Sequence, residues 1–190
     1  MISEFIDAYH RINDLLWRDY RNGTIDKENL RLKRFTLTLE KFGIRDMEVA
    51  KKIGIDYLDQ SPEQTILLPH AREILQYLSA CYSLSIITNG FYHTQISKLK
   101  NCDLLDFFDH VFTSEKIGIN KPYPGIFFHA IKAVSGNGQN CIMVGDDLKV
   151  DIGGARNAGI DQVYFNPENK PHKEDVTYEI NSLIELKQIF

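Results

Sequence analysis

The chain has 190 residues, a length that fits one ordinary domain or a core of about 120 residues with a small accessory module. Its composition, 43% hydrophobic and 25% charged, is that of a soluble globular protein. Its formal net charge is −4 and its basic residues are dispersed, so the charge pattern disfavours a nucleic-acid partner. No apolar run is long enough for a membrane span, and the acidic N-terminus is unlike a secretion signal. Three widely spaced cysteines without a C-x-x-C pair predict reduced thiols. We therefore expect a cytoplasmic protein.

Three segments with helical periodicity occupy the first part of the chain. In residues 5–20, apolar side chains recur at spacings of three and four. A second helix follows, with Thr24 or Asp26 placed to cap its start and Gly43 placed to end it. Residues 46–58 have the pattern of a third helix. No strand pattern interrupts these segments, so we expect an α-helical module at residues 1–66.

From residue 67 onward, short apolar runs alternate with helical segments. Strands are expected at residues 84–87, 111–113, 142–144 and 163–165. Helices are expected at residues 70–80, 92–102, 123–134, 149–158 and 182–190. Because strands separated by helices pair in parallel through right-handed crossovers, this order predicts an α/β core at residues 67–190. The fold class is thus a Rossmann-like parallel sheet with helices on both faces, preceded by the α-helical module.

Three carboxylates gather after the strand expected at residues 142–144. Asp146 and Asp147 are adjacent at its end, and Asp151 begins the next helix. Neighbouring carboxylates repel one another, and a hard divalent cation such as Mg²⁺ offsets that repulsion through oxygen ligands. Asp147 is explained equally well as the cap of the following helix. We expect Asp146 to hold Mg²⁺, with Asp151 and Asp147 as further ligands.

Two other polar groups stand where phosphate binding is expected. Thr88, Asn89 and Gly90 follow the strand at residues 84–87, and such a turn presents a hydroxyl and backbone N–H groups to an anion. A plain strand-to-helix turn would use the same residues. Lys121 precedes a proline, and its ammonium group can neutralise a phosphoryl group, although a solvated loop lysine also fits. Because ligands bind beyond the carboxyl ends of parallel strands, we expect these four residues to bind phosphate.

In order and spacing, these motifs resemble those of the haloacid dehalogenase superfamily over about residues 67–170. The matching segments are Thr88 in IITNG, Lys121 in NKPYPGIF, and Asp146 with Asp151 in GDDLKVD. The resemblance implies that Thr88 and Lys121 hold the transferring phosphoryl group and that Asp146 binds Mg²⁺. It also implies that residues 1–66 are a cap that selects the substrate. Residues 16–25 and ITNGF at 87–91 are similar to the pyrimidine 5′-nucleotidases, which implies nucleoside monophosphate substrates.

The superfamily's first motif, an apolar strand that ends in D-x-D-x-T, has no counterpart in this sequence. The candidate acids, none of which follows an apolar strand, are Asp56, Asp59, Asp106 and Asp109. The resemblance implies that the absent strand is central, between the strands that carry Thr88 and Asp146, and that it carries the nucleophile. Three explanations of the absent strand are open. The sequence is truncated, another strand fills the gap in the sheet, or an oligomer or partner covers that gap. Truncation is favoured, and the chain as given is expected to be inactive.

The favoured function is therefore a Mg²⁺-dependent phosphatase that hydrolyses nucleoside 5′-monophosphates through an aspartyl-phosphate. A phosphomutase would use the same phosphoryl machinery, and a non-catalytic binding or regulatory protein could retain the scaffold. An L-2-haloacid dehalogenase is disfavoured, because that chemistry has no need of a magnesium-binding acid cluster. A response-regulator receiver domain is disfavoured as well, because its acidic pair precedes its threonine and lysine.

Overall fold

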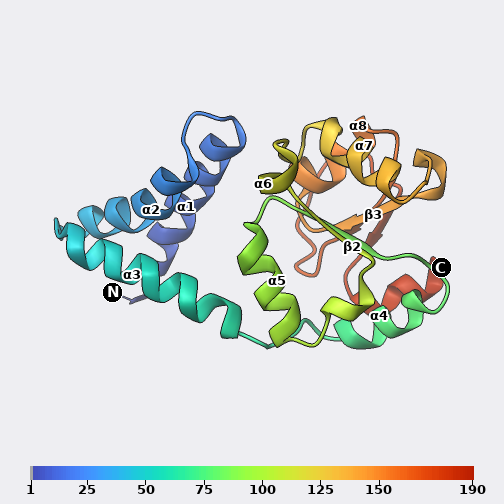
Figure 1. Ribbon diagram of the computed structural model, residues 1–190, viewed down its shortest axis with the longest axis horizontal. Coiled ribbons are helices and arrows are strands. Elements are labelled where there is room, and N and C mark those ends of the chain that lie inside the picture. The colour runs from blue at the N-terminus through green and yellow to red at the C-terminus, as the bar shows by residue number, and fades with distance from the viewer. Residues whose placement is uncertain (1) are drawn as a thin grey trace. The chain divides into compact units, whose positions relative to one another are not determined.

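The computed structural model describes residues 2–190 (Figure 1). The chain divides into two compact units, with the division between Gln64 and Thr65, where the sequence placed it after residue 66. Among the described helices, none combines the length and the apolar character that a membrane crossing requires.

The unit before Thr65 is entirely helical. Its elements are α1 (Ile2–Arg21), α2 (Lys27–Lys41), α3 (Met47–Gln60) and the 3₁₀ turn η1 (Ser61–Glu63). Asp26 caps α2 by accepting a hydrogen bond of 2.7 Å from a backbone N–H of its first turn, and Asp46 caps α3 in the same way. Phe35, Leu39 and Ala50 form the buried core between these helices. The three helices expected from periodicity are confirmed.

The unit from Thr65 to Phe190 alternates strands and helices. Its strands are β1 (Ser85–Thr88), β2 (His110–Thr113), β3 (Ile142–Gly145), β4 (Asp161–Phe165) and β5 (Tyr178–Ile180). Its α-helices are α4 (Ala71–Ser79), α5 (Tyr92–Asn101), α6 (Ser114–Ile117), α7 (Pro124–Ala133) and α8 (Gly153–Asn157). The 3₁₀ turns are η2 (Leu105–Phe107), η3 (Gly138–Asn140) and η5 (Leu183–Gln188), and η4 (Leu148–Ile152) is a π-helical turn.

The four expected strands are confirmed, but three details differ from the sequence-based expectation. The strand β5 was not predicted from the sequence. It has three residues, of which only Ile180 is buried, and this is too short for a recognisable alternation of apolar and polar residues. The helix expected at residues 149–158 is divided into the π turn η4 and the short helix α8. The helix expected at residues 182–190 is the 3₁₀ helix η5.

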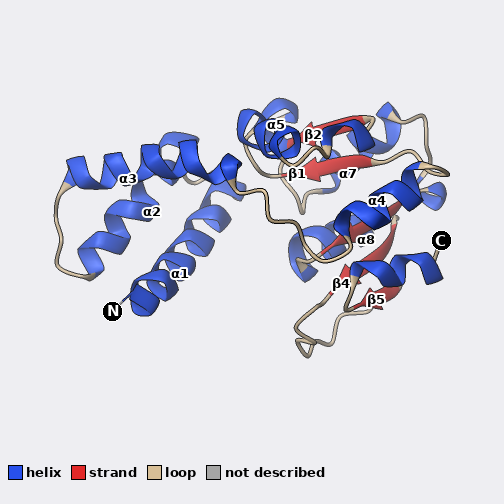
Figure 2. Ribbon diagram, turned by 90° about the horizontal axis from the view of Figure 1, so that it is seen from below, coloured by secondary structure: helices blue, strands red, loops and turns tan. Residues whose placement is uncertain are grey.

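All strand pairs are parallel, and they form two separate sheets (Figure 2). One sheet is β1–β2, and the other has the order β3–β4–β5. On one face of the larger sheet, α4 and η5 pack against Val163 and Ile180. On the other face, α7 and α8 pack against Met143 of β3 and also reach Ile87 of β1. The parallel pairing and the two helical layers are as expected, but no strand among the described residues joins β1 to β3.

Candidate active site

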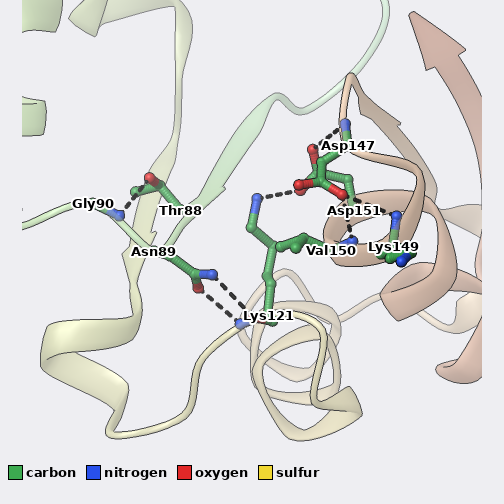
Figure 3. A network of polar contacts seen from close by, with 8 residues as sticks. All are labelled: Thr88, Asn89, Gly90, Lys121, Asp147, Lys149, Val150 and Asp151. Atoms are coloured by element: carbon green, nitrogen blue, oxygen red, sulfur yellow. Dashed lines mark hydrogen bonds and ion pairs between the residues drawn. The ribbon is translucent and has the colours of Figure 1, made fainter. Parts of the chain in front are cut away.

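A buried ion pair lies where the two sheets end (Figure 3). Lys121 Nζ donates a hydrogen bond of 2.6 Å to Asp151 Oδ1. Lys121 comes from the loop between α6 and α7, and Asp151 from the π turn η4 after β3. Their side chains are only 10% and 9% exposed, so each charge depends on the other for compensation. The pair fixes the ammonium group of Lys121 beside the acidic segment.

The backbone of Lys121 is held by the side chain of Asn89. Asn89 Nδ2 donates to the carbonyl oxygen of Lys121 at 3.0 Å, and the N–H of Lys121 donates to Asn89 Oδ1 at 2.8 Å. Both polar atoms of the Asn89 side chain are thus engaged with Lys121, across 32 residues of sequence. In this structure Asn89 positions the lysine, a role that the sequence pattern did not reveal.

Thr88 closes the turn that follows β1. Its Oγ1 accepts a hydrogen bond of 2.9 Å from the N–H of Gly90, and the hydroxyl proton remains available to donate to a ligand. A Cβ on Gly90 would come within 2.4 Å of the Gln95 side chain, so the turn is tight on this side. The Thr88 hydroxyl and the Lys121 ammonium group are the two donor groups of the site that a phosphate could use.

The three aspartates of the acidic segment have different surroundings. Asp147 Oδ1 accepts hydrogen bonds of 2.9 Å from the N–H groups of Lys149 and Val150, so this oxygen caps η4. Asp151 Oδ2 accepts only a long hydrogen bond, 3.3 Å, from the N–H of Asp147. Asp146 is exposed and makes no hydrogen bond or ion pair with any other residue in the range 2–190. The oxygens with the most free capacity therefore belong to Asp146 and to Oδ2 of Asp147, whereas both oxygens of Asp151 already accept a hydrogen bond.

This donor set fits Mg²⁺ through two carboxylates. Within residues 2–190, no three His, Cys, Asp or Glu side chains are gathered closely enough to hold a metal ion by themselves. Mg²⁺ is commonly bound by one or two carboxylates and completes its octahedron with water and substrate phosphate oxygens. The free carboxylate of Asp146 and Oδ2 of Asp151 provide such a pair of hard ligands.

These side chains share one cavity of about 760 Å³ within the unit from Thr65 to Phe190. Thr88, Lys121, Asp146 and Asp151 are among the residues that line it, and Lys121 and Asp151 are in direct contact. Asn89, Gly90 and Asp147 do not line the cavity. Each of them forms a hydrogen bond with a residue that does, namely Lys121, Thr88 and Asp151 respectively. The fold thus brings together polar groups from three segments that are far apart in the sequence.

Two glycines allow the close packing of this site and were not singled out from the sequence. A Cβ on Gly145 would lie 2.5 Å from Cβ of Asp151, so any side chain there would displace the acid. A Cβ on Gly154 would lie 2.7 Å from the Phe127 ring and 3.0 Å from Cα of Pro122, the residue after Lys121. The glycines are visible in the sequence, but the atoms that approach them come from distant positions.

Comparison with known proteins identifies the family. Residues 4–159 match the haloacid dehalogenase-like hydrolases. The chain belongs to this family. The pyrimidine 5′-nucleotidase YjjG of Escherichia coli is 31% identical over 190 residues, which cover 98% of this chain and 83% of that relative. The pyrimidine 5′-nucleotidase PynA of Streptococcus pneumoniae is 30% identical, with coverage of 97% and 79%.

A solved haloacid dehalogenase-like structure shares the fold of this chain. The crystal structure of the HAD-hydrolase YfnB from Bacillus subtilis, bound to magnesium, matches with a TM-score of 0.91 at 29% identity. The match covers 98% of this chain and 82% of the YfnB chain. The family resemblance found in the motifs is therefore confirmed by similarity over nearly the whole chain.

Proposed function

We propose that this protein is a Mg²⁺-dependent phosphomonoesterase whose substrates are pyrimidine nucleoside 5′-monophosphates. The observation that carries this proposal is that Thr88, Lys121, Asp146 and Asp151 line one cavity. Membership of the haloacid dehalogenase-like hydrolases supports the reaction class. The pyrimidine class of substrate is supported by the similarity to YjjG and PynA.

Each of these side chains has a role in binding a phosphoryl group. The ammonium group of Lys121 offsets the negative charge of the phosphoryl oxygens, and the Thr88 hydroxyl donates a hydrogen bond to one of them. Asp151 and Asn89 hold Lys121 in place by its two ends. When Mg²⁺ is bound, Asp146 and Asp151 would hold it, and it supplies further positive charge at the same oxygens.

The nucleophile of an aspartyl-phosphate mechanism is not provided by these residues. Such a carboxylate would have to stand at the end of a strand between β1 and β3, and no described strand occupies that position. We infer that residues 1–190 by themselves bind the substrate but release no phosphate. The helical unit before Thr65 is the part of the chain that we assign to substrate selection.

Calorimetric titration of the chain with thymidine 5′-monophosphate, with and without Mg²⁺, tests the proposed site. We expect binding that requires Mg²⁺ and weakens about 10- to 100-fold in Thr88→Val and Lys121→Met, because each loses a hydrogen bond to a charged group. Lys149→Met is the matched control, since it removes an exposed lysine of equal charge. Circular dichroism establishes that each variant is folded.

Two results would contradict the proposal. Binding that is independent of Mg²⁺, or equally strong in Lys121→Met and Lys149→Met, would show that the phosphate site lies elsewhere. Release of inorganic phosphate by residues 1–190 that is lost in Lys121→Ala would show that another aspartate replaces the missing nucleophile.

A further inference from the structure

The loop at residues 166–177 leads from the carboxyl end of β4 to β5 (Figure 2). Because β3 and β4 are parallel, with Gly145 beside Tyr164, the loop begins at the same edge of the sheet as Asp146. This is the edge at which open parallel sheets bind their ligands. The loop lines no part of the cavity of about 760 Å³, so the candidate active site does not account for its polar residues.

The side chain of Asn166 holds the backbone of Lys170 within this loop. Asn166 Nδ2 donates to the carbonyl oxygen of Lys170 at 3.0 Å, and the N–H of Lys170 donates to Asn166 Oδ1 at 2.9 Å. Asn89 makes the same pair of hydrogen bonds with Lys121, at 3.0 and 2.8 Å. Each asparagine directly follows a parallel strand, and each lysine precedes a proline. The fold therefore fixes two lysines by the same contacts at the carboxyl ends of two strands.

The second lysine borders a pocket of its own, with a volume of about 310 Å³. This pocket, here called the loop pocket, is lined by Asn166, Asn169, Lys170, Pro171, His172 and Glu179. Apart from the proline, every one of these residues has a polar side chain. The volume lies at the lower end of the range for small-molecule sites. The loop pocket therefore suits a small and polar ligand.

The walls of the loop pocket are ordered by contacts that occupy its carboxylate. Glu179 Oε1 accepts a hydrogen bond of 2.7 Å from Asn166 Nδ2, and Glu179 Oε2 lies 3.1 Å from His172 Nε2. Asn166 is only 2% exposed, and the His172 ring packs edge-on against Tyr164. Because both oxygens of Glu179 are engaged with wall residues, this carboxylate is a poor ligand for a metal cation.

The groups of the loop pocket with free capacity are donors. The Lys170 ammonium group has one partner within residues 2–190, Glu168 Oε2 at 3.0 Å, and can donate two further hydrogen bonds. Both side chains of this ion pair are largely exposed, so the pair is weak and open to exchange. The hydrogen bond to Glu168 raises the pKa of Lys170, and the charge of Asp146 acts in the same direction. Asn169 Oδ1 accepts from Asn181 Nδ2, which leaves the amide nitrogen of Asn169 as another donor.

We propose that the loop pocket binds a small oxyanion such as inorganic phosphate, with the ammonium group of Lys170 as its main contact. The oxyanion displaces the carboxylate of Glu168, which pairs with that ammonium group in this structure. A fixed cation with spare donors and an occupied carboxylate match an anion better than a cation. The proposal goes beyond the proposed phosphatase site, because Thr88 and Lys121 line the other cavity.

Titration of the metal-free chain with inorganic phosphate tests the loop pocket, with the NMR shifts of the backbone amides at 166–179 as the readout. Sodium chloride keeps the ionic strength constant, because exposed charges respond to screening. We expect saturable shifts and a loss of affinity of at least about fivefold in Lys170→Met, which removes a charge-assisted hydrogen bond. The matched control is Lys173→Met, which removes another exposed lysine of the same loop and should leave the affinity unchanged.

Removal of the competing carboxylate should have the opposite effect. Glu168→Gln should strengthen phosphate binding about two- to fivefold, because the ligand no longer has to displace an exposed ion pair. Its control is Glu174→Gln, which removes a carboxylate of the same loop that pairs with Arg156 instead. A parallel titration with thymidine 5′-monophosphate separates a free phosphate ion from the phosphate group of a nucleotide. We expect the nucleotide to bind more weakly, because the pocket is small.

Four outcomes would overturn the proposal. Shifts that do not saturate, or that sodium chloride alone reproduces, would show charge screening without a site. Equal affinities in Lys170→Met and Lys173→Met would place the ion away from Lys170. Loss of the loop shifts in Thr88→Val would assign the phosphate to the other cavity. A nucleotide that binds as tightly as inorganic phosphate would replace the free ion as the ligand. All these titrations omit Mg²⁺, which the proposed active site requires, so the two proposals fail independently.

Discussion

Replacing Lys121 with methionine removes the charge of a buried ion pair and keeps most of the apolar length of the side chain. Lys121 Nζ and Asp151 Oδ1 are 2.6 Å apart, and the two side chains are 10% and 9% exposed. Removal of one partner leaves the other as an uncompensated buried charge, which costs about 3–5 kcal/mol. We expect Lys121→Met to lower the free energy of unfolding of the unit from Thr65 to Phe190 by about that amount in the absence of Mg²⁺.

The double variant Lys121→Met/Asp151→Leu separates the charge effect from the loss of packing. Replacement of a buried ion pair by apolar residues of similar volume is often close to neutral, so the double variant should recover most of the lost stability. Native-state hydrogen exchange of the β4 amides is the assay, because β4 is a central and buried strand of this unit. The single tryptophan, Trp17, lies in α1, so its fluorescence reports the other unit and should not change.

The matched control is Lys149→Met, which removes an exposed lysine and should change the stability by less than about 0.5 kcal/mol. The reasoning would be refuted by equal β4 exchange rates in Lys121→Met and Lys149→Met. It would also be refuted if the double variant were as unstable as the sum of its two single variants, since the charges would then not be coupled.

Three further predictions concern other groups. Gly145→Ala should destabilise the chain by about 1–3 kcal/mol in urea unfolding, because the new Cβ would lie 2.5 Å from Cβ of Asp151. Iodoacetamide should modify Cys141 more slowly than an exposed thiol, because burial raises the pKa of Cys141 and lowers its thiolate fraction; mass spectrometry follows the reaction. The hydrogen bond from Asn166 lowers the pKa of Glu179 below 4.5, so the stability that Glu179 contributes is present above pH 4.5 and is lost as the pH falls through the lower, folded-state pKa. Glu179→Gln should therefore reduce the loss of stability on acidification, as measured by urea unfolding over a series of pH values.

Each of these three predictions can be compared with a control in the same chain. Gly153→Ala adds the same methyl group where the nearest atom is a carbonyl oxygen at 3.3 Å, so a loss equal to that of Gly145→Ala would remove the steric argument. Cys81 is exposed, so its rate of modification is the reference for an exposed thiol. If iodoacetamide modified Cys141 at the same rate, burial would not slow the reaction of Cys141. If the acid dependence of stability were the same with and without the Glu179 carboxyl group, the hydrogen bond would not stabilise the fold.

The order of the elements was available from local sequence patterns. Helical spacing and capping residues such as Asp26 and Asp46 act within a few residues, so the three N-terminal helices could be predicted. The four longer strands of the α/β unit had continuous apolar runs that ended in polar residues. By contrast, β5 has only three residues and is a strand because it pairs with β4. No local sequence pattern predicts that pairing.

In the candidate site, too, some features could be predicted from the sequence and others only from the tertiary structure. The sequence alone identified Thr88, Lys121 and the three aspartates as polar groups in motifs that resemble a known family. Only the tertiary structure decided that Asn89 holds Lys121 and that Asp151 is the partner of the buried lysine. It also decided that β1 and β3 line one space as open edges. The physical reason is that hydrogen bonds, ion pairs and strand edges depend on distance in space, and these contacts join residues about 30 or more positions apart in the chain.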